Sequence, residues 1–224
     1  GEADLDPLDA QTLRPRMDGT VALITGAGRG IGKAVAQELA AAGAVVVATD
    51  LSIAEEADYR TLRCDVLRAA DIAAAMDLCD GLGGVDVLVN SAGIIRRADP
   101  LTMSAQAWDE VIDVNVKGTF FVSQAAAKSM IRNKRGGTIV NIGSINAEKV
   151  FGDTVAYCSS KGAIHAMTRA MSLALAPFSI RVNTLAPGAV ADTDLEPERW
   201  QRDAEREAMV KRTPQRRLGA SKDI

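Results

Sequence analysis

The sequence predicts an α/β protein with a doubly wound parallel sheet, arranged as a single domain of three α/β/α layers. Short runs rich in β-branched residues recur along the chain, and segments of helical length separate most of them. Strands connected in this way pair in parallel. The runs are apolar throughout and do not alternate with polar residues, which predicts burial on both faces by crossover helices. A chain of 224 residues, of which 47% are apolar, can bury such a core.

The expected elements begin after residue 16. Residues 1–16 contain scattered Asp and Pro and no periodic apolar face, so we interpret them as a flexible arm and residues 17–224 as the domain. The connection between the second and third expected strands, Leu51–Asp58, has room for only about two helical turns. The six expected strands are Val21–Thr25, Ala44–Thr49, Arg60–Cys64, Val85–Asn90, Gly137–Ile142 and Ile180–Leu185.

Composition argues against several classes of function. The net charge is −3 and basic residues are mixed with acidic ones, so neither nucleic acid nor a membrane surface is an expected partner. The longest uncharged apolar stretch, Leu39–Thr49, is too short to span a bilayer. Because no signal peptide is recognisable either, we expect a cytoplasmic protein.

Cysteine and histidine content argues against a metal site. Cys64, Cys79 and Cys158 are widely spaced and form no CxxC pattern, which favours reduced core thiols over disulfides or zinc. The one histidine, His165, lies in a stretch of helical composition, where a structural role is favoured over a catalytic one. A Ser-His-Asp triad is correspondingly disfavoured, and we expect no bound metal.

A glycine-rich stretch, TGAGRGIG at residues 25–32, follows the first expected strand and opens the first expected helix. Four glycines at alternate positions suggest that another group approaches the backbone closely. The N-terminus of a helix favours an anion through its unpaired N–H groups and its dipole. A diphosphate is the expected occupant, although the spacing is not the literal G-x-G-x-x-G pattern, since Ile31 occupies the position of the third glycine.

An acidic residue, Asp50, closes the second expected strand, where a carboxylate can accept both hydroxyls of an adenosine ribose. The alternative role for Asp50 is a helix N-cap. A carboxylate there repels a 2′-phosphate, which favours NAD over NADP. Arg29 acts in the opposite direction, since a basic residue in the glycine loop can pair with that phosphate.

Further short motifs follow the glycine-rich stretch, and the set is Thr25–Gly32, Asn90–Gly93, Asn115, Ser144, Tyr157–Lys161 and Pro187–Gly188. They occur in the order and spacing of the short-chain dehydrogenase/reductase family, which the chain resembles from about Gly19 onward. In the motif after the fourth strand, Ser91 replaces the more common second asparagine. Asp192 stands where the family usually has a threonine that contacts the cofactor, and Thr193 is its candidate substitute.

This resemblance implies a Rossmann fold and an NAD(P)-dependent oxidoreductase that interconverts a secondary alcohol and a ketone without a metal. It implies that Lys161 holds the nicotinamide ribose and that Asn115 supports a water connecting Lys161 to solvent. The implied catalytic residues are Asn115, Ser144, Tyr157 and Lys161. The candidate cofactor-binding residues are Gly26, Arg29, Gly30, Ile31, Gly32, Asp50, Asp65, Val66, Asn90, Ala92, Gly93, Tyr157, Lys161, Pro187, Gly188 and Val190.

The chemistry of Tyr157 and Lys161 agrees with that assignment. The two residues are four positions apart in a segment of helical composition, so their side chains leave the same face. A nearby ammonium favours the phenolate. Together with a positive nicotinamide ring, it would have to lower the tyrosine pKa by roughly two to three units to provide a base near neutral pH. Ser144 can then hydrogen-bond the substrate oxygen.

Two alternatives to a polyol or sugar-acid dehydrogenase remain at this point. A dinucleotide-binding sensor or scaffold would be free to lose Tyr157 or Lys161, and this chain keeps both. A 3-oxoacyl-carrier-protein reductase would require NADPH and a basic docking patch. Arg132, Lys134 and Arg135 are candidates for that patch, although a solvated helix end, whose cations suit the C-terminal dipole, is the favoured explanation for them.

The substrate prediction depends on local resemblance to sugar-acid dehydrogenases of the gluconate and 2-deoxygluconate type. The similar stretches are Ala92–Arg97, Gly152–Thr154 and Lys211–Pro214. Arg96 and Arg97 follow the fourth strand, where a guanidinium could hold a carboxylate while Ser144 and Tyr157 contact the reacting hydroxyl. The alternative for Arg96 and Arg97 is a pair of solvated loop charges.

The end of the sequence carries three further expectations. Family members usually continue beyond residue 224 into a further helix and a seventh strand, so we expect those two elements to be missing here. The sixth strand then forms a bare apolar edge. Residues Pro187–Arg217 are expected to form a mobile lid over the substrate. The family also implies a homo-oligomer, a tetramer or a dimer.

Overall fold

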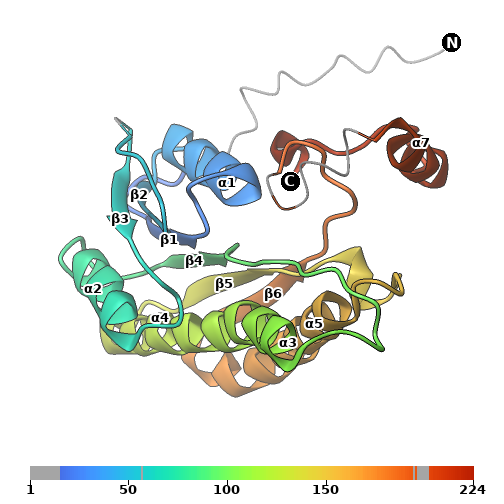
Figure 1. Ribbon diagram of the computed structural model, residues 1–224. Helices are drawn as coiled ribbons and strands as arrows, with labels where there is room; N and C mark the ends of the chain where they lie inside the picture. Colours follow the sequence, from blue (N-terminus) through green and yellow to red (C-terminus); the bar gives the residue numbers. More distant parts are fainter. Residues whose placement is uncertain (1–15, 57, 194, 196–201) are drawn as a thin grey trace, which may run out of the picture.

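The computed structural model of the chain describes residues 16–56, 58–193, 195 and 202–224. The described residues form one six-stranded parallel sheet in the order β3-β2-β1-β4-β5-β6. The doubly wound parallel sheet predicted from the sequence is confirmed (Figure 1). The expected arm falls almost wholly on residues 1–15, which lie outside the described residues. The strands are β1 (Val21–Thr25), β2 (Val45–Asp50), β3 (Arg60–Arg63), β4 (Val87–Asn90), β5 (Gly137–Ile142) and β6 (Ile180–Leu185).

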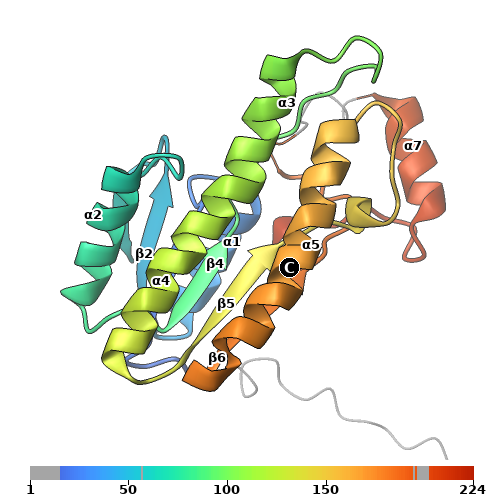
Figure 2. The same ribbon diagram turned by 90° about the horizontal axis from the view of Figure 1, so that it is seen from below.

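Helices cover both faces of the sheet. Helix α1 lies on one face, while α2, α4 and α5 lie on the other, with α4 and α5 side by side beneath the central strands (Figures 1 and 2). A π-helical segment, Asp113–Gly118, joins α3 to α4. The α-helices are α1 (Gly30–Ala41), α2 (Ala69–Asp80), α3 (Ala105–Ile112), α4 (Thr119–Asn133), α5 (Val155–Leu175) and α7 (Asp203–Arg212).

The apolar sequence of strand β1 is explained by the two clusters that pack on its two faces. Val21 and Leu23 pack with the cluster under α2 and α4, whereas Ala22 and Ile24 pack with the cluster under α1. All five residues of β1 are buried. A strand with helices on both faces has no solvent-facing side, which favours apolar residues along it. Its one polar residue, Thr25, lies at the carboxyl end and accepts hydrogen bonds from the backbone N–H groups of Ser91 and Ala92.

Two expected details differ from the structure. The described residues of the connection Leu51–Asp58 form no helix, so the chain passes from β2 to β3 without the usual crossover helix. Strand β6 lies at the edge of the sheet as expected, but its outward side chains include the exposed Arg181 and Asn183, so the strand is less apolar than expected.

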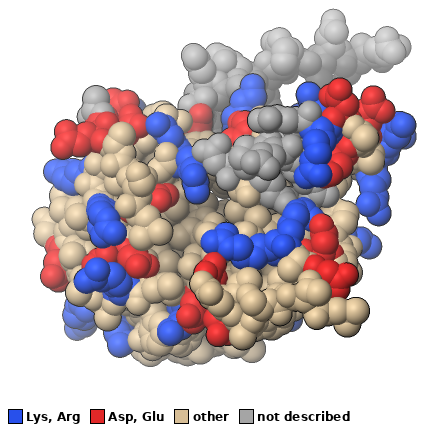
Figure 3. All heavy atoms as spheres, viewed as in Figure 1, with Lys and Arg blue, Asp and Glu red and all other residues tan. Residues whose placement is uncertain are grey.

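Charged side chains of both signs are interspersed over the face of the molecule shown in Figure 3. The three cysteines are buried free thiols. Burial raises the pKa of Cys79 to about 12 and is the main cause that raises that of Cys64 to about 11. Among the described helices, none combines the length and the apolar character that a membrane span requires.

Candidate active site

A cleft opens at the carboxyl ends of the strands, between the loops that follow β1 and β4. These two strands are neighbours, yet the chain proceeds outward from them in opposite directions. Such a reversal leaves a crevice where ligands bind in open α/β sheets. Residues that follow β1, β2, β4, β5 and β6 all line the cleft, so one depression collects side chains from across the sequence.

The glycines of the first loop are explained largely by the chain itself. Gly26 has φ +66°, and a Cβ atom there would lie 2.5 Å from the backbone nitrogen of Ala92. A Cβ at Gly28 would lie 2.5 Å from the carbonyl oxygen of Ser52, and one at Gly32 would collide with that of Gly26. Three of the four glycines therefore allow close backbone packing within the protein.

The start of α1 fits an anionic group. Arg29 occupies the N-cap position in an extended conformation and makes no side-chain hydrogen bond to the helix. The first N–H groups of α1 therefore have no capping side chain, and Arg29, Gly30 and Ile31 line the cleft at this point. Such a helix start can hold a diphosphate.

Asp50 lies beside that loop, at the end of β2. One carboxylate oxygen accepts a hydrogen bond of 3.0 Å from the backbone N–H of Gly28, and the other accepts one of 3.3 Å from Ser52. Asp50 lines the cleft. The described residues between β2 and β3 form no helix, so Asp50 has no helix to cap and the N-cap alternative does not apply. Asp65 and Val66, which follow β3, line the same end.

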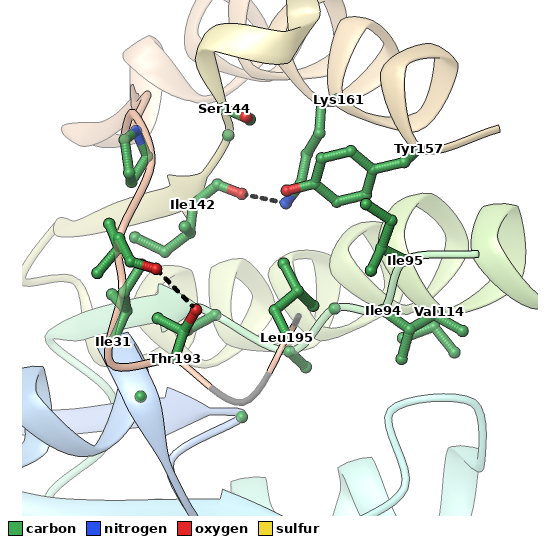
Figure 4. A pocket seen from close by; sticks show the side chains of 18 of the residues that line it. Ile31, Ile94, Ile95, Val114, Ile142, Ser144, Tyr157, Lys161, Thr193 and Leu195 are labelled. Carbon is green, nitrogen blue, oxygen red and sulfur yellow. Dashed lines mark hydrogen bonds between the residues drawn. The ribbon is translucent and has the colours of Figure 1, made fainter. Parts of the chain in front are cut away.

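Tyr157 and Lys161 extend into the cleft from the first turns of α5 (Figure 4). The Nζ atom of Lys161 lies 5.5 Å from the centroid of the Tyr157 ring and donates a hydrogen bond of 2.7 Å to the carbonyl oxygen of Ile142. The Lys161 side chain is buried, and burial lowers its pKa from 10.5 to about 8. A buried amine beside a phenol is the arrangement that tunes an acid–base pair.

Ser144 begins the short 3₁₀-helix Ile145–Ala147 directly after β5. Its hydroxyl oxygen accepts a hydrogen bond of 3.0 Å from the backbone N–H of Asn146, which fixes the side chain at the wall of the cleft. A hydroxyl that accepts this bond retains its hydrogen for a further bond. Ser144 can therefore donate to an oxygen atom of a ligand near Tyr157.

Asn115 and Asn90 support the site without lining the cleft. Asn115 is fully buried in the π-helical segment and bonds both backbone groups of Ile94, at 2.8 and 2.9 Å, and the Ser160 hydroxyl at 2.9 Å. The Nδ2 of Asn90 donates to Ser123 and Asn141 within the core. Gly32 also lies outside the cleft lining, because it packs against Gly26.

Arg96 and Arg97 are held by acidic partners outside the cleft. Arg96 pairs with Glu110 at 3.0 Å, and Arg97 pairs with Asp153 at 2.5 Å. Neither guanidinium is among the groups that line the cleft. The structure therefore does not bring this predicted pair together with Ser144 and Tyr157.

Most of the wall around Tyr157 consists of apolar residues that were not predicted from the sequence. Phe151 lies in the loop before α5, while Leu195 and Met209 belong to the expected lid. That expected lid falls partly on residues 194 and 196–201, which lie outside the described residues, and it contains α7. Ile94 and Ile95 fall within the stretch Ala92–Arg97, whereas the other residues of this wall belong to no motif, and position after a strand end is the signal available for part of them. The missed apolar residues are Ile94, Ile95, Val114, Ile145, Phe151, Leu195 and Met209.

Most of the predicted cofactor residues do line the cleft. Thr193 lines it as well, whereas Asp192, its neighbour at the family's usual threonine position, does not. No group of three potential metal-binding side chains occurs among the residues whose placement is described. Those predicted from the sequence and found in the lining are Gly26, Arg29, Gly30, Ile31, Asp50, Asp65, Val66, Ala92, Gly93, Ser144, Tyr157, Lys161, Pro187, Gly188 and Val190.

Comparison with known proteins identifies the family. A sequence model described as short chain dehydrogenase matches residues 20–204. The chain is 38% identical to D-threitol dehydrogenase of Mycolicibacterium smegmatis, covering 83% of this chain and 75% of that protein. It is 34% identical to the 3-oxoacyl-(acyl-carrier-protein) reductase FabG of Vibrio cholerae, covering 93% and 87%.

A solved structure agrees with the sequence comparisons. The gluconate 5-dehydrogenase of Burkholderia cenocepacia, crystallised with NADP and tartrate, superposes with a TM-score of 0.86 and 36% identity, covering 93% of this chain and 86% of that one. The fold, the cleft at the strand ends and these relatives agree. The chain therefore belongs to the short-chain dehydrogenase family and is an oxidoreductase that acts on CH–OH groups.

Proposed function

We propose that the chain is an NAD-dependent dehydrogenase that interconverts a secondary alcohol and a ketone on a small polyol or sugar-derived substrate. The observation that carries this proposal is the arrangement of Tyr157, Lys161 and Ser144 in one cleft with the open start of α1. An acid–base pair and a hydroxyl donor lie at one end, and an anion-binding helix start lies at the other.

Each of the three side chains has a distinct part in this chemistry. Tyr157 removes the proton of the substrate hydroxyl through its phenolic oxygen, and the ammonium of Lys161 stabilises the phenolate. Ser144 donates a hydrogen bond to the substrate oxygen and orients it. A nicotinamide cofactor, when bound, accepts the hydride from the carbinol carbon.

The proposed preference for NAD depends on Asp50. Its carboxylate lies in the cleft next to the glycine loop, held by the N–H of Gly28. A 2′-phosphate about 4 Å from this carboxylate would cost on the order of 4 kcal/mol per charge pair at an effective dielectric constant of 20. Arg29 lines the same region and opposes this preference, and the gluconate 5-dehydrogenase neighbour was crystallised with NADP.

The charges of the cleft favour a neutral polyol or hydroxyketone over a sugar acid. Among the described residues, those lining it with charged side chains are Arg29, Asp50, Asp65 and Lys161. Arg29 and Asp65 follow β1 and β3, and Asp50 is the last residue of β2, so all three lie at the proposed dinucleotide end. Near Tyr157, the polar side chains of Ser144 and Asn146 face an otherwise apolar wall. Among the described residues no guanidinium lines this end, since Arg96 and Arg97 are paired elsewhere.

A substrate panel tests the proposal. We expect NADH formation from NAD⁺ with one or more sugar alcohols, with lower kcat/KM for the sugar acid of equal length and for NADP⁺. Tyr157→Phe should reduce kcat by at least about a thousandfold while leaving the Kd of NADH within about threefold.

A different result in that panel identifies the alternatives. Turnover of a 3-oxoacyl thioester with NADPH and of no polyol would refute the proposed substrate and indicate the carrier-linked reductase, whose basic candidates Arg132 and Arg135 pair here with Asp80 and Asp86. Tight NADH binding without turnover of any substrate would indicate a dinucleotide-binding protein.

A further inference from the structure

Two segments far apart in the sequence meet at the exit of β6. Val190 and Gly219 form a parallel β-bridge, supported by hydrogen bonds from Ala191 N–H to Gly219 C=O at 2.9 Å and from Gly219 N–H to Ala189 C=O at 2.8 Å. This bridge fixes the backbone immediately before and after residues 192–218. The segment Ala189–Ala191, which follows β6 at the cleft, is thereby hydrogen-bonded to Gly219 near the C-terminal end of the chain.

A side-chain clamp extends the bridge. The Oδ1 atom of Asp192 accepts two hydrogen bonds from Ser221, one of 2.7 Å from the backbone N–H and one of 2.9 Å from the hydroxyl. Ser221 is buried, and it begins the 3₁₀-helix Ser221–Asp223, which packs against α1. We refer to these two residues as the Asp192–Ser221 clamp.

The residue that follows Asp192 lies over the glycine loop. A Cβ atom built on Gly30 would lie 3.4 to 3.6 Å from the Cγ2, Cβ and Cα atoms of Thr193, so Thr193 is in direct contact with the start of α1. Its hydroxyl donates to the carbonyl oxygen of Val190 at 3.3 Å, and its side chain lines the cleft (Figure 4). Asp192 itself is outside the lining.

These contacts form a continuous connection. Ser221 is fixed against α1, Asp192 is fixed by Ser221, and Thr193 is consequently held against Gly30, also on α1. We infer that Asp192 and Ser221 are positioning residues that hold Thr193 over the glycine loop and so close the diphosphate end of the cleft on a bound dinucleotide. This inference rests on the proposed function, because it assigns the diphosphate to the start of α1.

The geometry makes a specific demand on residue 192. Both bonds go to one oxygen atom, so an acceptor at that place, not the negative charge, is what the clamp requires. An amide side chain can supply the same acceptor. Asp192→Asn should therefore preserve the clamp, Asp192→Ala should remove both bonds, and Ser221→Ala should remove the hydroxyl bond alone.

The test measures NADH binding by fluorescence titration and hydrogen exchange of the ligand-free protein over residues 189–193. We expect the Kd to rise at least about tenfold in Asp192→Ala, to stay within about threefold in Asp192→Asn and to take an intermediate value in Ser221→Ala. Exchange should increase in the same order. Glu207→Ala, which removes an exposed carboxylate on α7 outside the cleft lining, is the charge control and should match the wild type.

Each other outcome has a defined meaning. An unchanged Kd in Asp192→Ala, or an Asp192→Asn variant as weak as Asp192→Ala, would overturn the inference, and Ser221→Ala decides the case if Asp192→Ala does not fold. Wild-type protein that binds neither NADH nor NADPH would refute the proposed function instead. The exchange measurement would then still show whether the clamp orders Thr193.

Discussion

Burial of Lys161 gives the fold a pH dependence that can be measured. Its side chain is 5% exposed, and burial lowers its pKa from 10.5 to about 8. The native state therefore disfavours the ammonium relative to the unfolded chain. Between about pH 8 and 10.5 the unfolded chain binds more protons, so this residue makes stability rise with pH in that window.

The size of this effect follows from the two pKa values. One proton bound only by the unfolded chain changes the free energy of unfolding by about 1.4 kcal/mol per pH unit. The full shift corresponds to a penalty of about 3 kcal/mol below pH 8. Raising the pH from about 7.5 to about 9.5 should remove about 2 kcal/mol of it.

Urea denaturation of the wild type and of Lys161→Met tests this reasoning. Methionine keeps much of the side-chain volume and does not titrate, so the stability difference between the two proteins should shift by about 2 kcal/mol in favour of the wild type over that interval. Identical pH dependence of the two proteins would refute the argument. Repeating the comparison in a Tyr157→Phe background removes the phenol, whose ring centroid lies 5.5 Å from Nζ.

Three further predictions follow from the cleft and its surroundings. Asp50→Ser should lower kcat/KM with NAD⁺, because it removes the carboxylate that holds Gly28, yet raise the NADP⁺/NAD⁺ ratio at least about tenfold; an unchanged ratio contradicts the assignment of Asp50. Gly32→Ala should cost about 1–3 kcal/mol in thermal unfolding, since the new methyl meets backbone, whereas Gly162→Ala, with open space around it, should be neutral or stabilising; equal shifts would contradict the packing argument. Arg97→Ala should leave the acid-to-polyol ratio of kcat/KM within about threefold, and a selective loss with the acid would place Arg97 at the substrate after all.

Local sequence was sufficient to predict the sheet. The bounds of β1, β5 and β6 agree with the predicted runs, and those of β2, β3 and β4 differ by two residues or fewer at either end. A strand buried on both faces can be recognised from its own residues, because the signal is a continuous apolar run and needs no knowledge of distant partners. The π-helical segment Asp113–Gly118 has no comparable signature, since its geometry depends on the bonds that Asn115 makes to Ile94 and Ser160.

Short motifs also contribute much of the cleft lining, because most of them lie directly after a strand or on the first turns of a helix. Position alone was not sufficient for Arg96 and Arg97. Both arginines follow β4 at the predicted edge of the sheet, but their acidic partners are distant in the sequence. Glu110 lies 14 positions after Arg96, and Asp153 lies 56 positions after Arg97. A single sequence shows that a guanidinium is near a site, not which carboxylate competes for it.

Asp192 is a second residue whose partner could not be predicted from the sequence, and it lies near the proposed cofactor end of the cleft. In the sequence it is visible as a departure from the family's threonine, which says nothing about its partner 29 positions away. The structure indicates that Thr193 occupies the cleft because Asp192 is committed to Ser221. Exchanging the order of these two residues would therefore do more than move a hydroxyl by one position. It would place a carboxylate over Gly30, facing the proposed diphosphate, and it would replace the carboxylate oxygen that both Ser221 bonds share by the oxygen of a shorter side chain.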